Sequence, residues 1–272
     1  MGLFSKLFGG DRTPPRDIAE LVAPLCRPGI RLAPASAPTG SWLGGRPVVP
    51  RGFEWPRRDE RALGFLGQLD LAELARACAL EWLPTAGSLA FFYDVVDSPW
   101  GYDLEHAGGW RVEHVAGEGQ ELAPPADIAT EAVFARRPIE ARRVSLPPEG
   151  LSPAVKALEL SDRESDLLGE HVEALFEHGP DHHVGGFAYP VQFTEVELEC
   201  QLASNGLYIG DEDPRVEALA PGASEWRLLL QLGSDPELGM EWGDGGSLYF
   251  CVRAAQARRG DFTVVWTVLQ CT

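Results

Sequence analysis

Two stretches of the chain repeat the same landmarks in the same order, and this repetition limits the folds available to it. LGQL at 66–69 is followed by GSLAF at 87–91, and LLQL at 229–232 is followed by GSLYF at 246–250. Upstream of each stretch, Leu43-Gly44-Gly45 corresponds to Val184-Gly185-Gly186. Three matches in the same order predict an internal duplication, in which the glycines supply tight turns.

The repeated stretches are rich in strand-forming residues, which predicts an α+β fold: internally duplicated antiparallel β units packed together with peripheral helices. The 272 residues include 22 prolines and 30 glycines, which favours many short elements over a long helical bundle. We expect a leader at 1–12 and a single domain over 13–272. Within it, pseudo-repeats at about 30–150 and 180–272 are joined by a helical insert at about 151–179.

Local patterns predict the individual elements. Strands are expected at 88–96, 110–115, 139–146, 226–231, 247–253 and 262–269. A first helix is expected to start at Thr13-Pro14, with Ile18, Leu21, Val22 and Leu25 on its inner face, and to end before Pro28-Gly29. Further helices are expected at 71–80 after the capping residue Asp70, at 127–136, and in two parts of the insert, from 153 and from 162. The span 195–206 alternates like a strand, but its Glu-rich composition and the stop at Asn205-Gly206 favour a helix. We expect 31–62 to be extended loop with short strands.

Each repeat carries one glutamine among the apolar residues of its predicted strand, so its amide is expected to be buried. A buried glutamine must be hydrogen-bonded or it is costly. We expect Gln68 and Gln231, with the turn glycines Gly45 and Gly186, to form a structural seam between the halves. A ligand-facing role for the two amides is the alternative.

The leader has Leu3, Phe4, Leu7 and Phe8 on one side of a possible two-turn helix. Such a helix is too short to be stable alone. We expect a loose tail or an edge-packing segment, with docking on a membrane surface as the alternative. No stretch has the length of a transmembrane helix, so stable membrane insertion is not expected.

The formal charge of −18 disfavours direct binding to nucleic acid and favours a basic protein partner. Residues 195–245 hold twelve acidic residues against two arginines, more than half of the net charge. Acidic residues arranged around aromatic residues can receive a basic segment. The candidate partner-binding residues are Trp226, Asp235, Glu237, Glu241, Trp242 and Asp244. A merely solvated acidic face is the alternative.

Candidate catalytic and metal-binding patterns are weak. The adjacent pair His182-His183 lacks further ligands at metal-site spacing, and the acidic loop lacks the ligand spacing of an EF-hand. A nucleophile–base pair of Cys200 or Cys251 with a histidine has no supporting motif. We therefore expect no catalytic residues, no metal and no cofactor. The five cysteines are odd in number and show no CxxC pair, which indicates reduced thiols in a cytoplasmic protein.

The combined motifs resemble a known family. GGRPVVP with a later WP, GFLGQLDL, LPTAGSLAFFYD, GGFAYPVQ and WRLLLQL with WGDGGSLYF are similar to the bacterial YwqG family, a domain of unknown function. The resemblance covers about Pro15 to Cys271. Cys251 and Val252 depart from the usual aromatic and isoleucine, which implies a change in packing. The family pattern offers no catalytic residues to carry over.

The resemblance also carries functional expectations. YwqG-like domains resemble the eukaryotic programmed-cell-death-protein-2 group, which is implicated as dedicated chaperones of a ribosomal protein, and some bacterial relatives are proposed immunity proteins against toxins. We expect a non-enzymatic protein-binding module, immunity-like or chaperone-like, that binds a basic partner such as a toxin or a ribosomal protein through an acidic surface. The alternative is a hydrolase-like or other small-molecule enzyme that uses a cleft between the halves.

Overall fold

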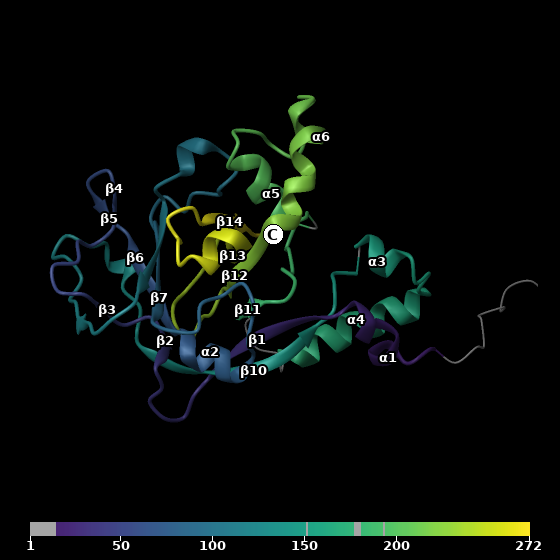
Figure 1. Cartoon of the computed structure of the whole chain (residues 1–272), viewed down its shortest axis with the longest axis horizontal. Coiled ribbons are helices and arrows are strands. Elements are labelled where there is room, and N and C mark those ends of the chain that lie inside the picture. The colour runs from purple at the N-terminus through teal and green to yellow at the C-terminus, as the bar shows by residue number, and fades with distance from the viewer. Residues whose placement is uncertain (1–14, 151, 177–180, 193) are drawn as a thin grey trace, which may run out of the picture.

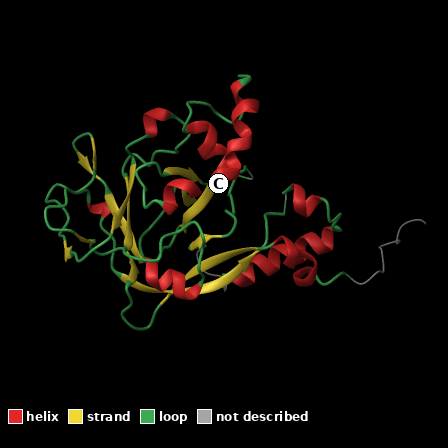
Figure 2. Ribbon diagram, in the orientation of Figure 1, coloured by secondary structure: helices red, strands yellow, loops and turns green. Residues whose placement is uncertain are grey.

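A large antiparallel sheet dominates the molecule. In the computed structural model, which describes residues 15–150, 152–176, 181–192 and 194–272, ten strands pair in the order β14-β13-β12-β11-β1-β10-β2-β6-β7-β8 (Figure 1). Their bounds are β1 (Arg27–Pro34), β2 (Ser41–Leu43), β6 (Gly64–Asp70), β7 (Ser88–Tyr93), β8 (Trp110–Val115), β10 (Arg137–Leu146), β11 (His183–Gly185), β12 (Trp226–Gly233), β13 (Ser247–Arg253) and β14 (Trp266–Gln270). Helices surround this sheet, so the fold is mixed α+β (Figure 2).

The sheet is organised around its central antiparallel pair, β1 and β10. The strands β2, β6, β7 and β8 follow β10 outward in chain order, and β11, β12, β13 and β14 follow β1 outward in chain order. β1 therefore borders the strand group that follows β10 in the chain, and β10 borders the group that lies between the two central strands in the chain. Among the described strands, the hydrogen-bonded connection between the two groups runs through this pair.

The sheet curls until its two edges meet. The ring of Trp110 in β8 lies 5.1 Å from that of Trp266 in β14, and the Trp110 indole N–H donates to the carbonyl of Val265. The loop after β7 also runs beside β14, where the backbone N–H of Leu269 donates to the carbonyl of Trp100. Gly101 permits this approach, since a Cβ there would collide with the β14 backbone. The main apolar core fills the nearly closed sheet.

A helical arm extends from one end of the β1–β10 pair (Figure 1). It consists of α1 (Ile18–Val22), α3 (Pro153–Lys156) and α4 (Asp162–Leu175), which share a small apolar cluster. A second small cluster lies on the outer side of the first strand group, where Phe53 and Trp55 pack on Phe92. There β3 (Val48–Val49) pairs with β9 (Gln120–Glu121), and β4 (Arg57–Arg58) pairs with β5 (Arg61–Ala62).

The remaining helices are short. α2 (Leu71–Ala77) begins after Asp70, whose carboxylate accepts from the backbone N–H of Glu73 as predicted. The others are α5 (Val196–Ala203), α6 (Arg215–Leu219) and α7 (Ala254–Arg258), with 3₁₀ turns η1 (Ala23–Leu25), η2 (Leu104–His106), η3 (Thr130–Ala132) and η4 (Ala220–Glu225). Within the described part of the chain, no helix is long and apolar enough to cross a membrane.

Most predicted elements are present. The strands expected at 88–96, 110–115, 139–146, 226–231 and 247–253 correspond to β7, β8, β10, β12 and β13, and the ambiguous span 195–206 contains the helix α5. The insert holds α3 and α4, with Ser161 as the N-cap of the second. The first expected helix begins after its N-cap Asp17 and passes near Pro24 from α1 into η1. Its expected start at Thr13-Pro14 lies outside the described residues. The leader at 1–12 lies outside the described residues.

Two expectations were wrong. The segment 127–136 forms only the short turn η3, because its end is extended and the carbonyl of Phe134 accepts from the backbone N–H of Gly45. The last strand starts at Trp266 rather than 262, because the carboxylate of Asp261 binds the backbone N–H and hydroxyl of Thr263 in a turn. The segment 31–62 is loop with the short strands β2 to β5, as predicted, except that residues 31–34 belong to the central strand β1.

Candidate binding surfaces

The two tryptophans of the predicted partner site lie in the core. Trp242 is 1% exposed, packs edge-on against Tyr93 at 5.9 Å, and donates its indole N–H to the carbonyl of Gly233. Trp226 is 3% exposed and donates its indole N–H to Oε1 of Gln201. Neither side chain is available at the surface, so a partner that docks on the loop would meet its other residues.

The carboxylates of the same loop divide into one buried and three exposed groups. Asp235 is 2% exposed and accepts from Arg137 at 2.7 Å and from the backbone N–H groups of Glu237 and Leu238. Burial opposes ionisation of Asp235, but the hydrogen bond from His182 and the charge of Arg137 hold its pKa below the ordinary value. Glu237, Glu241 and Asp244 are exposed, and Glu237 pairs with Arg137.

The two adjacent histidines have separate structural partners. His182 accepts at Nδ1 from the backbone N–H of Gly233, which leaves the Nε2 proton directed at Asp235 3.4 Å away. His183 is fully buried, with Nε2 2.9 Å from the carbonyl of Phe187, and burial lowers its pKa to about 4. Among the residues that the structure describes, no three His, Cys, Asp or Glu side chains converge as metal ligands would.

The buried cysteines Cys200 of α5 and Cys251 of β13 face each other. Burial raises the pKa of the Cys200 thiol well above its ordinary value, and Cys251 adds to the effect. The hydrogen bond from Cys200 is the largest influence on Cys251 and lowers its pKa, but burial together with the charges of Glu197 and Glu199 leaves that pKa raised. Thiols in this environment are protonated and weakly nucleophilic. All five cysteines are free.

The two predicted seam glutamines each hold a loop of their own strand group. Oε1 of Gln68 accepts from the backbone N–H of Val48 at 2.8 Å, and Nε2 donates to the Val48 carbonyl and to the hydroxyl of Ser88. Oε1 of Gln231 accepts from the backbone N–H of Tyr189 at 2.9 Å. The two amides are 3% and 0% exposed, so neither faces a ligand at the surface.

The glycines of these loops take the left-handed conformation. Gly45 has φ of 74° and Gly186 has φ of 70°, and the glycine before each is left-handed too. Such values strain any residue with a Cβ. In both loops the backbone N–H captured by the glutamine lies three residues after the second glycine. The glycine pair turns the chain, and the amide fixes the turn to the adjoining strand.

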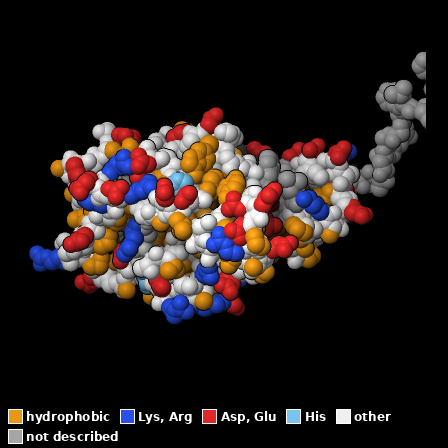
Figure 3. All heavy atoms as spheres, turned by 90° about the horizontal axis from the view of Figure 1, so that it is seen from above, with side chains coloured by type: hydrophobic (Ala, Val, Ile, Leu, Met, Phe, Trp, Pro, Cys, Tyr) orange, Lys and Arg blue, Asp and Glu red, His pale blue; other side chains and the backbone are white. Residues whose placement is uncertain are grey.

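An exposed aromatic surface lies where the two strand groups meet. We define it by Trp100, Tyr102 and Leu104 from the loop after β7, and Tyr208 from the loop after α5. The Tyr102 ring lies between those of Trp100 and Tyr208, with centroids 6.3 and 5.8 Å away. Trp100, Leu104 and Tyr208 are 40%, 51% and 49% exposed. Figure 3, which looks down on the top of Figure 1, shows hydrophobic side chains gathered on this face with acidic ones beside them.

The loops that carry the aromatic surface are acidic. Segments 98–108 and 204–214 contain five carboxylates and no lysine or arginine. We call these five the acidic rim: Asp103, Glu105, Asp211, Glu212 and Asp213. Asp213 pairs with Arg215 just outside the second segment. The exposed loop around Asp244 is connected to the same face, because Gln192 links the hydroxyl of Tyr102 to the carbonyl of Cys271, which lies against Gly243.

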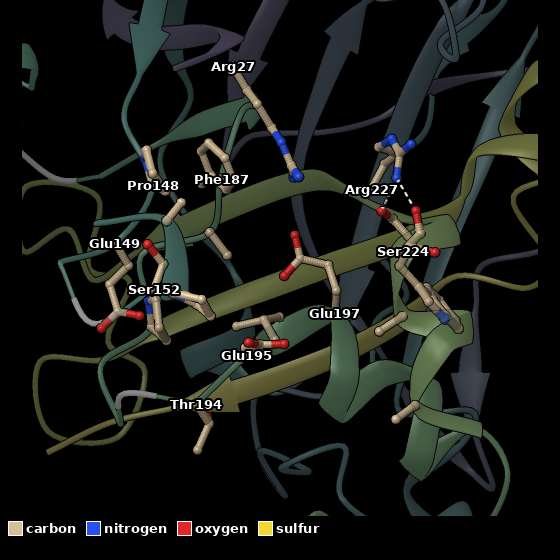
Figure 4. A pocket seen from close by; sticks show the side chains of 18 of the residues that line it. Arg27, Pro148, Glu149, Ser152, Phe187, Thr194, Glu195, Glu197, Ser224 and Arg227 are labelled. Carbon is tan, nitrogen blue, oxygen red and sulfur yellow. Dashed lines mark hydrogen bonds between the residues drawn. The ribbon is translucent and has the colours of Figure 1, made fainter. Parts of the chain in front are cut away.

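A groove of about 630 Å³ lies between the base of the arm and the second strand group. Its apolar lining includes Phe187, Pro148, Pro190, Val196 and Pro221. Figure 4 shows Glu197 pointing into it, with Arg27 and Arg227 on one side and Glu149 and Glu195 on the other. This size is within the range of pockets that hold small ligands, about 300–1,000 Å³.

The sequence matches one family model. The model of a domain of unknown function, DUF1963, matches residues 41–271. The chain belongs to this family. The matched region takes in the acidic rim and most of the groove, whereas α1, β1 and Arg27 precede it. No curated protein matches the sequence.

Sequence reasoning found the acidic segment of this DUF1963 protein but missed its exposed aromatics. Trp226 and Trp242 lie in or beside strand patterns, which is typical of core residues. Trp100 and Tyr208 instead occur in glycine-containing turns, outside any periodic pattern, and each is followed within a few residues by acidic residues. That combination is the signal that points to the surface. The groove residues Arg27 and Glu197 carry no such signal, because four separate segments form the groove.

Proposed function

We propose that the protein is a non-enzymatic binding module that receives a basic segment of a protein partner on the aromatic surface. The observation that carries this proposal is the continuous row from exposed Trp100 through half-buried Tyr102 to exposed Tyr208, bordered by the acidic rim. The neighbouring cations are Arg215, which pairs with Asp213, and Arg58, which donates to the carbonyl of Glu105. Exposed apolar patches with polar rims are typical of protein-interaction sites. Aromatic faces and carboxylates together are complementary to lysine and arginine side chains.

The hydrogen bonds that the rim carboxylates already accept indicate which of them can bind a basic side chain. Asp211 accepts from the backbone N–H of Tyr208 and Asp103 from that of Glu105, so both shape their loops as well as supplying charge. Glu212 is exposed and unpaired within the described residues, which leaves its carboxylate free for a basic side chain. A guanidinium over the exposed ring of Trp100 would gain about 0.5–1 kcal/mol.

The net charge, the family resemblance and the free cysteines support the class of partner and the location of the protein. The net charge of −18 would steer a basic protein toward the molecule and repel nucleic acid. The resemblance to YwqG-like domains supports an immunity-like or chaperone-like role, with a toxin or ribosomal protein as partner. The five free cysteines support a reducing compartment such as the cytoplasm.

We also propose that the fold arose by internal duplication. Support comes from the matching outward orders of the two strand groups and from a bulge just before each glutamine, between Phe65 and Gly67 and between Leu228 and Leu230. The shared capture of a backbone N–H by Gln68 and Gln231 adds to it. The aromatic surface would then lie across the boundary between the copies.

The function is tested with a labelled peptide of alternating arginine and leucine. Fluorescence anisotropy should show saturable binding to the wild type that weakens as salt rises. The double variant Trp100→Ala/Tyr208→Ala should bind about tenfold more weakly, because two exposed aromatic contacts are lost. Val133→Ala, at a similarly exposed site outside this surface, is the matched control.

Two further experiments separate the contribution of charge from that of apolar contact. Glu105→Arg/Glu212→Arg should abolish binding of the arginine peptide, whereas Glu170→Arg on the arm should leave it nearly unchanged. A peptide of alternating glutamate and leucine should not bind the wild type. Equal affinity of the double aromatic variant and the wild type would contradict the proposal.

A further inference from the structure

The groove at the base of the arm is built independently of the aromatic surface. Its lining comes from the start of β1, the segment after β10, the loop after β11 with the start of α5, and η4 with the start of β12. These four segments lie far apart in the sequence and converge on one apolar trough. The groove therefore exists only in the folded molecule, which is typical of a ligand site.

The guanidinium of Arg27 is oriented by an aromatic ring and forms no ion pair with a described carboxylate. Its carbon lies 4.0 Å from the centre of the Phe187 ring, which orients it by a cation–π contact. No carboxylate of a described residue forms an ion pair with it. Burial lowers the pKa of Arg27, and Arg227 lowers it further, while Glu197 acts in the opposite direction. These donors are available to an anionic group.

Arg227 presents a second guanidinium to the same trough. Its Nη1 donates to the carbonyls of Ser224 and Trp226 at 2.7 Å, which fixes the side chain at the rim (Figure 4). Those bonds leave its remaining N–H groups for a ligand, since a guanidinium has five donors. Glu197 stands between the two arginines (Figure 4). Burial raises the pKa of Glu197, against the influence of Arg27 and Arg227.

The other side of the groove is negative. Glu149 lies across the lining from Arg227 (Figure 4), and Glu195 is close enough to raise its pKa, although burial is the larger cause and Lys156 opposes both. The groove thus has arginines at one side, carboxylates at the other, and apolar walls between them. A complementary ligand would carry a carboxylate and an ammonium group separated by an apolar part.

We propose that this groove binds a short peptide with free termini. Its C-terminal carboxylate lies against Arg27 and Arg227, and its N-terminal ammonium lies against Glu149 and Glu195. Apolar side chains of the peptide pack on Phe187, Pro148, Pro190 and Val196. Guanidinium–carboxylate pairs are charge-assisted and directional, so they set the orientation of the peptide in the groove.

This inference goes beyond the proposed partner surface and does not depend on it. The aromatic surface selects for positive charge, whereas the groove selects for two opposite charges on either side of an apolar trough. Trileucine, the probe used here, has both termini and three apolar side chains. Its binding is measured by isothermal titration calorimetry in three forms: with free termini, with a C-terminal amide and with an N-terminal acetyl group.

The free form should bind, and either modification should weaken binding about tenfold. Arg227→Met should weaken the free peptide about tenfold and leave the amide unchanged, because the contact that it removes is already absent there. Arg27→Met should behave alike, and Glu149→Gln should act only on peptides with a free ammonium. Arg258→Met, on α7 away from the groove, is the matched control.

The binding of the three peptide forms to the wild type and to the variants supports or overturns the peptide site. Each variant is first shown to unfold at the wild-type temperature, and Arg27→Met and Arg227→Met provide two independent tests of the carboxylate contact. Absence of binding of the free peptide, or equal binding of the three forms, would overturn the inference. Loss of trileucine binding in Trp100→Ala/Tyr208→Ala would also contradict it, since that surface lies elsewhere.

Discussion

At the scale of single residues, buried polar side chains fix loops to the sheet. Gln68 has three hydrogen-bond partners, whereas Gln231 uses its oxygen and leaves a buried Nε2 without a partner among the described residues. The two amides occupy corresponding places but are unequally satisfied. Their contributions to stability should therefore differ.

The variant Gln68→Leu should lower the free energy of unfolding by about 2–4 kcal/mol, because Val48 and Ser88 lose buried partners. Gln231→Leu should cost only about 1 kcal/mol, because it also removes an unpartnered amide. Urea denaturation measures both, with Gln120→Leu on the exposed strand β9 as a neutral control. Equal losses at the two positions would show that the different hydrogen bonding of the two amides does not determine the effect.

The buried carboxylate of Asp235 depends on Arg137, which reaches it from β10. Arg137→Met should destabilise the fold by about 3 kcal/mol, because it leaves a charge in the interior with only His182 and backbone N–H groups. Arg143→Met on the same strand removes an exposed arginine, and it should cost less than about 1 kcal/mol. Thermal unfolding followed by circular dichroism compares the two.

Two neighbouring groups give opposite pH dependences. Burial lowers the pKa of His183 from 6.5 to about 4, so its contribution to stability is lost as pH falls through this range. Burial, with Glu173, raises the pKa of Asp181 from 3.8 to about 6, so its ionisation costs stability as pH rises through that range. Between pH 4 and 6 the two effects offset each other.

Asp181→Asn removes one side of this balance. The variant should be more stable than the wild type at pH 7, by about 1–3 kcal/mol, and should lose stability more steeply on acidification from pH 6 to 4. Denaturant titrations across this pH range test the slope. A variant whose slope is shallower than that of the wild type would be incompatible with these pKa shifts.

At the scale of elements, the outcome of sequence-based prediction depended on how local each signal was. Ser88–Tyr93 and Ser247–Arg253 carry dense strand formers after a glycine turn, and both formed strands as predicted. β1 was missed because prolines argue against a central strand, although Pro28 and Pro34 lie only near its two ends. β11 has only three residues, and it is a strand because it pairs with β1. A local sequence pattern does not encode that pairing.

The same contrast applies to the candidate sites. Acidic enrichment could be read from the sequence, because charge is a local property. Whether a tryptophan is buried depends on residues from the other strand group, such as Tyr93 against Trp242. Trp242 was therefore assigned to the partner surface, although it lies in the core. The groove could not be predicted, because its four segments meet only through tertiary packing.

The arm offers a test at the element scale. Glu164 closes the capping box with Ser161 at the start of α4 and binds the backbone and guanidinium of Arg16, which precedes α1. Hydrogen bonds from Arg16 and Ser161 lower the pKa of Glu164. Glu164→Ala should increase amide hydrogen exchange in α1 and α4 and leave β6, β7, β12 and β13 protected. Uniform faster exchange across the sheet would contradict an independently stabilised arm.

At the scale of the whole molecule, the curled sheet brings distant acidic loops to one face. The loop after β7 and the loop after α5 are about a hundred residues apart, yet Tyr102 and Tyr208 touch across the boundary. Neither strand group holds the aromatic surface alone. The fold, by closing its edges beside Trp100, creates the surface that we propose as the partner site.

The central claim is that a basic partner docks at this surface, and site-specific photo-cross-linking in the native host tests it most directly. A photo-cross-linking amino acid replaces Tyr208 in one strain and Glu170, on the arm, in another. The account predicts a cross-linked protein with a strongly basic surface from position 208 only, and loss of that product in Glu105→Arg/Glu212→Arg. An acidic partner at position 208, or the same product from both positions, would contradict it.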